Sequence, residues 1–171
     1  MVGSLSDHVH IYVDASFKDS GYSGLGGALF DSSGRILAFF SEELDKEFLE
    51  LAKEENQSNV LQEMEMLALL ISIEIWCPVW QGHKVVAFTD SEAVRCSFLK
   101  TWSHKNPCSK LFARIFFVEE SNLCPVWLKR VPSQSNPVDI LSRRRMASWM
   151  GIQNTSVDFR KFWKHGVHSL G

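Results

Sequence analysis

The segment Lys84–Thr89 is a continuous apolar run between Gly82-His83 and Asp90. A strand of this composition is buried on both of its faces, because helices cover each side of the sheet to which it belongs. The chain is therefore expected to form a mixed α/β domain with helices flanking a sheet.

The residues before this run predict three antiparallel strands in a meander. His8–Val13 alternates apolar with polar or aromatic residues and stops at Asp14-Ala15-Ser16. Gly24–Phe30 is the second strand, and Arg35–Ser41 follows a hairpin turn at 31–34. The residues after the run predict one more strand, Pro125–Val131. The sheet is thus expected to have five strands, three antiparallel and then parallel.

Helices are predicted in the intervening segments. The longest begins at Ser58 or Asn59, either of which can cap it, and ends near Trp76 before Cys77-Pro78. The others are expected at Ser91–Trp102, Lys110–Glu120 and Asp139–Met150, with an acidic, solvated helix inserted near 42–55. We expect one domain over 1–150 and a C-terminal extension over 151–171.

Composition sets the general class of the protein. With 171 residues, 45% of them hydrophobic and 22% charged, the chain is one soluble domain with a core of its own. Uninterrupted apolar runs fall short of the roughly 18 residues that a membrane helix needs, and the N-terminus lacks the order of a signal peptide. An intracellular monomer without membrane contact is expected, with its four cysteines reduced because they show no CxxC pairing.

The formal charge of −2 hides two unequal parts. Residues 1–128 hold 10 Lys+Arg and 18 Asp+Glu, whereas residues 129–171 hold 8 Lys+Arg and 2 Asp. The basic end is either a phosphate-binding face or a solubilising tail. Within it, the aromatic residues Phe159, Phe162 and Trp163 alternate with cations; they either form a stacking surface or pack back on the domain.

Four acids occupy element ends or a core helix. Asp14 and Asp90 end the first and fourth strands, Glu65 lies in the long helix, and Asp139 opens the last helix. If those two strands are neighbours, Asp14 and Asp90 emerge side by side at their carboxyl ends, where α/β sheets place their sites. Crowded carboxylates imply a bound cation, and hard oxygen ligands select Mg²⁺ or Mn²⁺.

These acids and their neighbours resemble the ribonuclease H family, and specifically the domain attached to retrotransposon reverse transcriptases. The resemblance covers about residues 9–150 and rests on four motifs in order, namely HIYVD ending at Asp14, MEMLA at 64–68, TDS at 89–91 and SNPVDILSR at 135–143. It implies a ribonuclease H-like fold. It also implies a metal-dependent endonuclease that hydrolyses the RNA strand of RNA/DNA hybrids, leaving 5′-phosphate and 3′-hydroxyl ends.

By this resemblance, two Mg²⁺ ions, for which Mn²⁺ can substitute, would be held by Asp14, Glu65, Asp90 and Asp139. One ion would activate a water and the other would stabilise the leaving oxygen. Glu63 is a rival to Glu65, but the family pattern Glu-x-x-Ala fits Glu65 with Ala68.

The resemblance also implies substrate contacts. Ser16, Gln62 and Ser91-Glu92 would read the 2′-hydroxyl, although a structural capping role is the alternative for each. Phosphates would be contacted by Lys129, Arg130, Arg143, Arg144 and Arg145. For Arg143 a structural ion pair is an equal alternative.

The chain departs from cellular members of the family in two ways. The loop before the last acid, residues 129–135, holds no histidine and has Ser133 roughly in its place, and 103–109 is too short for a basic protrusion. We therefore expect weak binding alone, with an attached polymerase or other domain supplying affinity. A DEDD exonuclease is disfavoured because Asp14-Ala15-Ser16 lacks the required Glu, and a DDE transposase because its last acid is a Glu. An inactive docking module for protein or nucleic acid is the remaining alternative.

Overall fold

A mixed sheet with the strand order β5-β4-β1-β2-β3-β6 organises the computed structural model, which describes residues 8–18, 21–55, 60–95, 107–143, 149 and 151–168. Its strands are β1 (His8–Ser16), β2 (Gly24–Phe30), β3 (Ile36–Glu43), β4 (Lys84–Thr89), β5 (Val126–Arg130) and β6 (Gln153–Asn154). β1, β2 and β3 pair antiparallel, whereas β4 joins β1 and β5 joins β4 in parallel. The expected meander followed by parallel strands is confirmed.

Two details of the sheet differ from the expectation. The sheet has six strands instead of five, because Gln153–Asn154 adds a short parallel strand beside Ala38 and Phe39 of β3. In addition, β1 continues through Asp14 to Ser16, because its last residues pair with the glycine-rich start of β2. Asp14 therefore lies inside a strand and not at its end.

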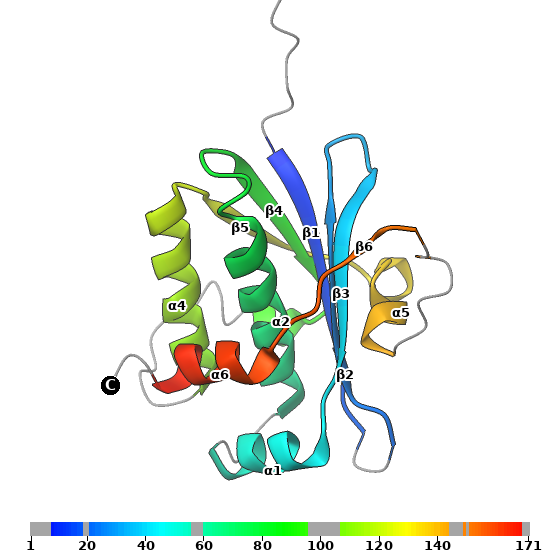
Figure 1. Cartoon of the computed structure of the whole chain (residues 1–171), viewed down its shortest axis with the longest axis vertical. Coiled ribbons are helices and arrows are strands. Elements are labelled where there is room, and N and C mark those ends of the chain that lie inside the picture. The colour runs from blue at the N-terminus through cyan, green and yellow to red at the C-terminus, as the bar shows by residue number, and fades with distance from the viewer. Residues whose placement is uncertain are drawn as a thin grey trace, which may run out of the picture.

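The helices form layers on both faces of the sheet (Figure 1). They are α1 (Lys46–Glu55), α2 (Val60–Trp76), α4 (Pro107–Asn122), α5 (Asp139–Ser142) and α6 (Phe159–His168), with a 3₁₀ turn η1 at Ser133–Ser135. α2 packs on β1 and β2 and is covered in turn by α4 and α6, whereas α5 lies on the other face, against β1, β2 and β3. A helix enclosed in this way is predominantly apolar, as the sequence of α2 is apart from five polar positions, namely Gln62, Glu63, Glu65, Ser72 and Glu74.

Two apolar cores result. The main core lies between the sheet and α2, and its fully buried side chains include Ile11, Phe40 and Leu67. The smaller core lies under α5, where Leu141 and Trp149 pack on β2 and β3. The strand Lys84–Thr89, expected to be buried on both faces, is buried on one face only, because Lys84, Val86 and Phe88 on its other face are exposed or partly exposed.

Glycines set how closely α5 approaches the sheet. A Cβ atom added at Gly26 would lie 2.6 Å from Leu141 Cβ, and one at Gly24 would lie 2.3 Å from the Ser142 carbonyl oxygen. The glycines of β2 therefore allow α5 to lie directly on the strand. The consequence is that Asp139 and Ser142 are brought beside β1.

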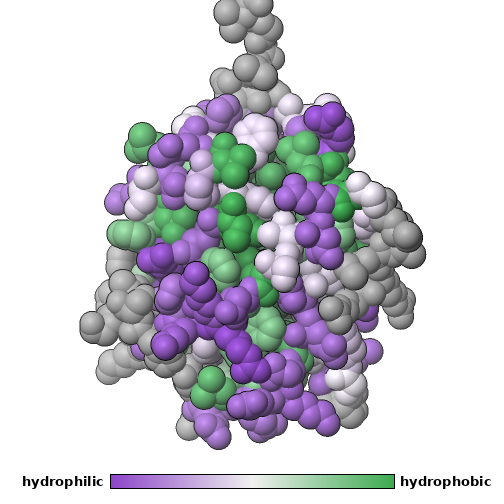
Figure 2. All heavy atoms as spheres, in the orientation of Figure 1, coloured by the Kyte–Doolittle hydropathy of each residue, from purple (hydrophilic) through white to green (hydrophobic). Residues whose placement is uncertain are grey.

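The C-terminal extension packs back on the domain. Phe159, Trp163 and Val167 of α6 are buried in the main core, whereas Arg160, Lys161 and Lys164 are exposed. Hydrophilic side chains gather over α6 and α1 in the lower part of Figure 2. Of the two alternatives for this segment, packing is the one that the structure shows.

The other helices lie where the sequence predicts them, but their bounds differ from the expected ones. The acidic helix begins later than expected, at Lys46, because β3 runs on to Glu43. α5 is described only as far as Ser142, and the remainder of the helix expected to Met150 lies largely outside the described residues. The expected caps Ser58 and Asn59 also lie outside them, as does most of the helix expected over 91–102.

Cys77 and Cys124 are buried and form no disulfide. Within the described part of the chain, no helix has the length and apolar character needed to cross a membrane.

Candidate active site

Asp14 and Asp90 meet because β1 and β4 are parallel neighbours. Tyr12 pairs with Phe88 in the register of these strands, so the two acids follow at corresponding positions. Carboxylate oxygens of Asp14, Asp90 and Glu65 all lie within 4.8 Å of one another. The predicted juxtaposition of Asp14 and Asp90 is therefore confirmed.

Glu65 reaches this group from α2, which crosses the sheet on the side of the main core. Its side chain is only 6% exposed, and Asp14 is 5% exposed. Glu63, its rival in the sequence, is also buried but is not among the residues that line the cleft at the acids. The helix therefore presents Glu65 to the other two carboxylates.

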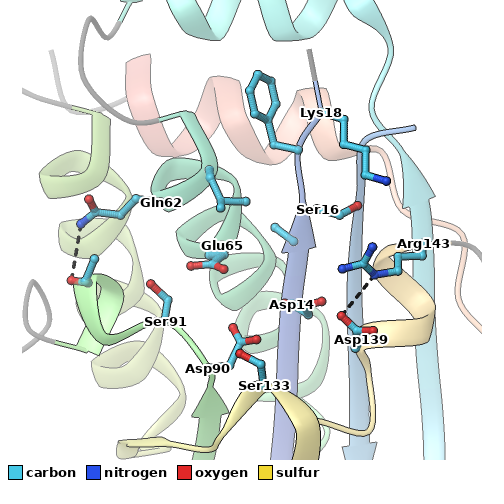
Figure 3. A pocket seen from close by; sticks show the side chains of 14 residues that line it. Asp14, Ser16, Lys18, Gln62, Glu65, Asp90, Ser91, Ser133, Asp139 and Arg143 are labelled. Carbon is cyan, nitrogen blue, oxygen red and sulfur yellow. Dashed lines mark hydrogen bonds and ion pairs between the residues drawn. The ribbon is translucent and has the colours of Figure 1, made fainter. Parts of the chain in front are cut away.

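Asp139 approaches from the opposite side, at the start of α5. It lines the same cleft of about 430 Å³ as the other three acids (Figure 3), although it is not one of the three whose oxygens lie within 4.8 Å. Its Oδ1 is 3.3 Å from Nε of Arg143, one turn along. Four acids from four separate elements thus meet in one cleft.

Burial and mutual repulsion make ionisation of this cluster costly. Burial, reinforced by the charges of Asp90 and Asp139, raises the pKa of Asp14 to about 7. Burial, with the charges of Asp90 and Asp14, raises the pKa of Glu65 to about 8. Carboxyl groups in this state gain stability from a cation that compensates their charge.

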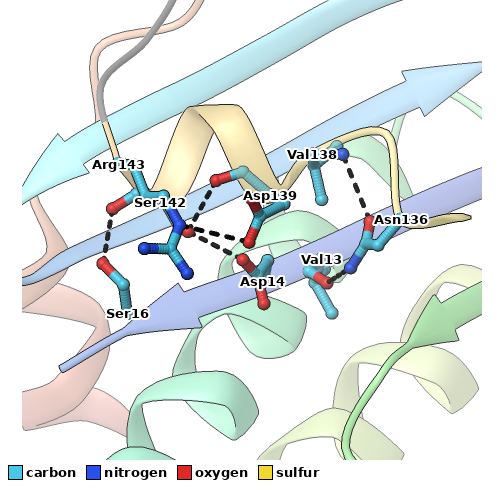
Figure 4. Close-up of polar contacts among 8 residues, drawn as sticks. All are labelled: Val13, Asp14, Ser16, Asn136, Val138, Asp139, Ser142 and Arg143. Carbon is cyan, nitrogen blue, oxygen red and sulfur yellow. Dashed lines mark hydrogen bonds and ion pairs between the residues drawn. The ribbon is translucent and has the colours of Figure 1, made fainter. Parts of the chain in front are cut away.

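Ser142 is a site residue that the sequence analysis missed. Its Oγ donates a 2.7 Å hydrogen bond to Oδ2 of Asp14, and its carbonyl oxygen accepts a 2.7 Å bond from Oγ of Ser16 (Figure 4). This pair of contacts joins α5 to the end of β1 and fixes the orientation of the Asp14 carboxylate. The sequence signal that could have indicated Ser142 was its place beside Arg143 in the SNPVDILSR motif.

Asn136 anchors the loop that leads to Asp139. Its Nδ2 donates to the carbonyl oxygen of Val13 at 3.0 Å, and its Oδ1 accepts from the backbone N–H of Val138 at 3.2 Å. Asn136 is buried, so neither bond is open to competition from water. The motif asparagine therefore places the start of α5 relative to β1.

Seven of the residues predicted to contact substrate are described, and four of them line the cleft, namely Ser16, Gln62, Ser91 and Arg143. Gln62 Nε2 donates to the carbonyl oxygen of Ala93 at 3.5 Å. Ser91 Oγ accepts from the Val94 N–H at 3.1 Å and hydrogen-bonds Glu65, which lowers the pKa of that carboxyl against the effect of burial. These side chains thus have structural partners, and their contacts with a substrate stay predictions.

Lys129 and Arg130 are not brought into the lining of the cleft. Nε of Arg130 lies 3.5 Å from Oε2 of Glu92, on the side of β5 that faces the helices. Lys129 directly precedes Arg130 in the strand, so its side chain projects from the other face of β5. Arg144 and Arg145 lie outside the described residues.

The cleft also contains residues that motif reasoning did not assign. Lys18, Phe17 and Leu61 line it, as does Ser133, the residue that stands in place of a histidine. Lys18 is exposed and lies two residues beyond β1. Its position four residues after Asp14 was the only signal that could have indicated it.

Comparison with solved structures shows the same architecture. The chain superimposes on ribonuclease H1 of Halobacterium salinarum with a TM-score of 0.62 at 17% identity, covering 82% of this chain and 98% of that one. It superimposes on LC11 ribonuclease H1 in complex with an RNA/DNA hybrid with a TM-score of 0.64 at 18% identity, covering 82% of this chain and 98% of that one. For the foamy viral protease-reverse transcriptase with an RNA/DNA hybrid the TM-score is 0.62 at 15% identity, covering 86% of this chain and 21% of that one.

These likenesses establish the ribonuclease H fold. No protein-family model and no curated protein sequence matches the chain. The structural resemblance expected from the four motifs is thus confirmed at the level of the fold. The chain corresponds to about a fifth of the length of the foamy viral protein.

Proposed function

We propose that the chain is a metal-dependent endonuclease that hydrolyses the RNA strand of RNA/DNA hybrids and leaves 5′-phosphate and 3′-hydroxyl ends. The observation that carries this proposal is the cluster of Asp14, Glu65 and Asp90, whose oxygens lie within 4.8 Å of one another in a cleft that Asp139 also lines. Ribonuclease H structures in complex with such hybrids share the fold, which supports the choice of substrate.

The residues present fit divalent metal ions. All four acids offer hard oxygen ligands, without a histidine or cysteine in the cleft lining that would favour zinc. The raised pKa values of Asp14 and Glu65 mean that a cation would stabilise the ionised cluster. Asp14, Glu65, Asp90 and Asp139 would hold two Mg²⁺ or Mn²⁺ ions. When bound, these ions would supply an activated water and neutralise charge on the leaving oxygen.

The surrounding residues would position the acids and the substrate. Ser142 orients the Asp14 carboxylate through its hydroxyl. Lys18 and Arg143 supply positive charge at the cleft for substrate phosphates. Ser16, Gln62 and Ser91 lie where short polar groups could contact the 2′-hydroxyl that distinguishes RNA from DNA.

The chain would act in cells either alone or joined to a reverse transcriptase, whose other parts would add affinity for the hybrid. This second possibility is supported by the foamy viral protein, in which a region of the same fold is part of a larger chain. The domain by itself would bind substrate as a monomer.

A substrate panel tests the proposal. Equal amounts of end-labelled RNA/DNA hybrid, double-stranded RNA, double-stranded DNA and single-stranded RNA are incubated with the purified chain and Mg²⁺. We expect cleavage of the hybrid only, in its RNA strand, with 3′-hydroxyl ends that a polymerase can extend. Cleavage of double-stranded DNA at a similar rate, or of no substrate with either Mg²⁺ or Mn²⁺, would contradict the proposal. The latter result would favour an inactive docking module.

A further inference from the structure

The face of β1, β4 and β5 opposite α2 and α4 carries a set of aromatic and cationic side chains. Residues alternate between faces along a strand, so the neighbours of buried Ile11, Ala87 and Val126 project to this side. We call the resulting surface the open sheet face. It consists of His8, His10, Tyr12, Lys84, Val86, Phe88, Trp127 and Lys129.

The helix on this side of the sheet covers β2, β3 and part of β1. α5 packs against β1, β2 and β3 (Figure 1). Trp149 adds to the same small core. Trp127 is 60% exposed, and Lys84 and Lys129 are exposed, whereas the remaining five residues are partly exposed. Together with the partly exposed aromatic residues of this face, the Trp127 indole forms an apolar patch bordered by lysines, and patches of this kind mark interaction sites.

Strand register arranges these side chains in rows across the sheet. His10, Val86 and Trp127 form one row, and Tyr12, Phe88 and Lys129 form the next. The Tyr12 and Phe88 rings are stacked, with centroids 4.5 Å apart and planes 13° from parallel, and His10 meets the edge of Phe88 at 5.6 Å. The rows thus form a preorganised aromatic platform with a cation at its β5 side.

The charge of this face contrasts with that of the chain around it. None of its eight residues is acidic, and two are lysines, although residues 1–128 carry an excess of acids. Aromatic rings and cations with no carboxylate complement a partner that is anionic and offers flat apolar rings. Single-stranded nucleic acid has both properties, because its phosphates are charged and its bases are unstacked.

We propose that the open sheet face binds single-stranded RNA or DNA, with a base stacked on Trp127 and with Lys84 and Lys129 contacting phosphates. Exposed aromatic side chains on a sheet serve this purpose in other nucleic-acid-binding domains. Tyr12 lies two residues before Asp14 in β1, and Phe88 lies two residues before Asp90, which directly follows β4. A strand bound here would therefore end close to the cleft. The binding does not depend on the metal ions or on the proposed cleavage.

The test measures binding with cleavage suppressed. Fluorescently labelled single-stranded RNA and DNA 12-mers are titrated with the chain in EDTA, and anisotropy is followed between about 50 and 200 mM salt. We expect Trp127→Ala to weaken binding about 5- to 150-fold, the usual effect of losing one stacked base. Lys129→Gln should lower the slope of log affinity against log salt by about 0.7.

Matched controls lie on other surfaces of the molecule. Phe117→Ala removes a 57% exposed aromatic side chain from α4, and Lys161→Gln removes an exposed cation from α6. Both should leave binding unchanged. Trp127→Ala should also keep the wild-type rate of hybrid cleavage, so that a loss of single-strand binding is distinguished from a failure of the nuclease. The RNA and DNA arms show whether the 2′-hydroxyl contributes.

Three results would overturn the proposal. The first is no binding to either single strand at about 50 mM salt. The second is unchanged affinity in folded Trp127→Ala and Lys129→Gln variants. The third is self-association of the chain that Trp127→Ala abolishes while single-strand binding stays intact, because the face would then be a protein interface.

Discussion

Ser142 donates a 2.7 Å hydrogen bond to Oδ2 of Asp14, although 128 residues separate them in sequence. This contact joins the short helix α5 to the central strand β1 at a carboxylate that is subject to the charges of both Asp90 and Asp139. The hydrogen bond favours the ionised form of Asp14 and so lowers its pKa, against the larger effect of burial. Ser142 therefore favours the ionised carboxylate that the proposed metal site would require.

Replacing Ser142 should weaken metal binding. We expect Ser142→Ala to lower affinity for Mn²⁺, measured by calorimetry, about 10- to 100-fold, which is the usual effect of losing a residue that orients a metal ligand. Ser41→Ala is the matched control, because Ser41 donates a buried hydrogen bond to the carbonyl of Leu141 in the same helix. Both variants should lose stability. Equal metal affinity in the two variants would show that Ser142 serves only to hold α5.

Close approach of α5 to β2 should be needed for activity. We expect Gly26→Ala to lower both thermal stability and hybrid cleavage, because the added Cβ would lie 2.6 Å from Leu141 Cβ and 2.8 Å from the Ser142 nitrogen. Overpacking of this kind costs about 1–3 kcal/mol. Gly34→Asn, in an open hairpin turn with φ of +86°, should change neither property greatly. Wild-type cleavage by folded Gly26→Ala would contradict this account of α5.

Without metal, the domain should be less stable at pH 8 than at pH 5. The pKa of Asp14 is raised to about 7 and that of Glu65 to about 8, so the folded chain holds protons that the unfolded chain releases near pH 4. Stability therefore falls as the pH rises through this window, by up to about 1.4 kcal/mol per pH unit for each group. Urea denaturation in EDTA at both pH values measures the difference.

The Asp14→Asn/Glu65→Gln double variant isolates this contribution, because neither replacement titrates. Its loss of stability between pH 5 and pH 8 should be clearly smaller than that of the wild type. The variant should also be the more stable of the two proteins at pH 8 without metal. The same pH dependence in both proteins would mean that these two carboxyls are not protonated in the folded state.

Arg143 offers a test between substrate binding and structural pairing. Its ion pair with Asp139 joins side chains that are each 42% exposed, and such pairs contribute at most about 1 kcal/mol to stability. We expect Arg143→Gln to raise KM for the hybrid several-fold with little change in melting temperature. Arg35→Gln, which removes a similar exposed pair with Asp31 in the hairpin, should leave KM unchanged. A fall in melting temperature without a change in KM would assign Arg143 a structural role.

The sequence predicted the parts of the fold that local patterns determine. Gly24–Phe30 and Lys84–Thr89 have the expected bounds because turn residues and charged neighbours delimit them. The end of β1 was misplaced because Asp14-Ala15-Ser16 has the composition of a turn, whereas pairing with Gly24 extends the strand. β6 was missed because two residues beside β3 leave no periodic pattern.

The site could be predicted as far as its motifs reach. Asp14, Glu65, Asp90 and Asp139 were found because each belongs to a short motif in or beside a strand or helix that the sequence predicts. Ser142 was not, because its hydrogen bond to Asp14 depends on how closely α5 approaches the sheet, which no local pattern records. Lys129 and Arg130 were expected to contact phosphates, but neither lines the cleft, and strand alternation turns their side chains to opposite faces of β5.

Hybrid cleavage by an acid-to-amide variant tests the central claim that the four-acid cleft is a nuclease centre. The initial rate of cleavage of a labelled RNA/DNA hybrid is measured with Mg²⁺ for the wild type, Asp90→Asn and Asp158→Asn, the last being an exposed acid next to α6. We predict Mg²⁺-dependent cleavage by the wild type and Asp158→Asn, and a loss of about 100-fold or more in Asp90→Asn. Cleavage by Asp90→Asn at the wild-type rate, or none by the wild type, would contradict the account.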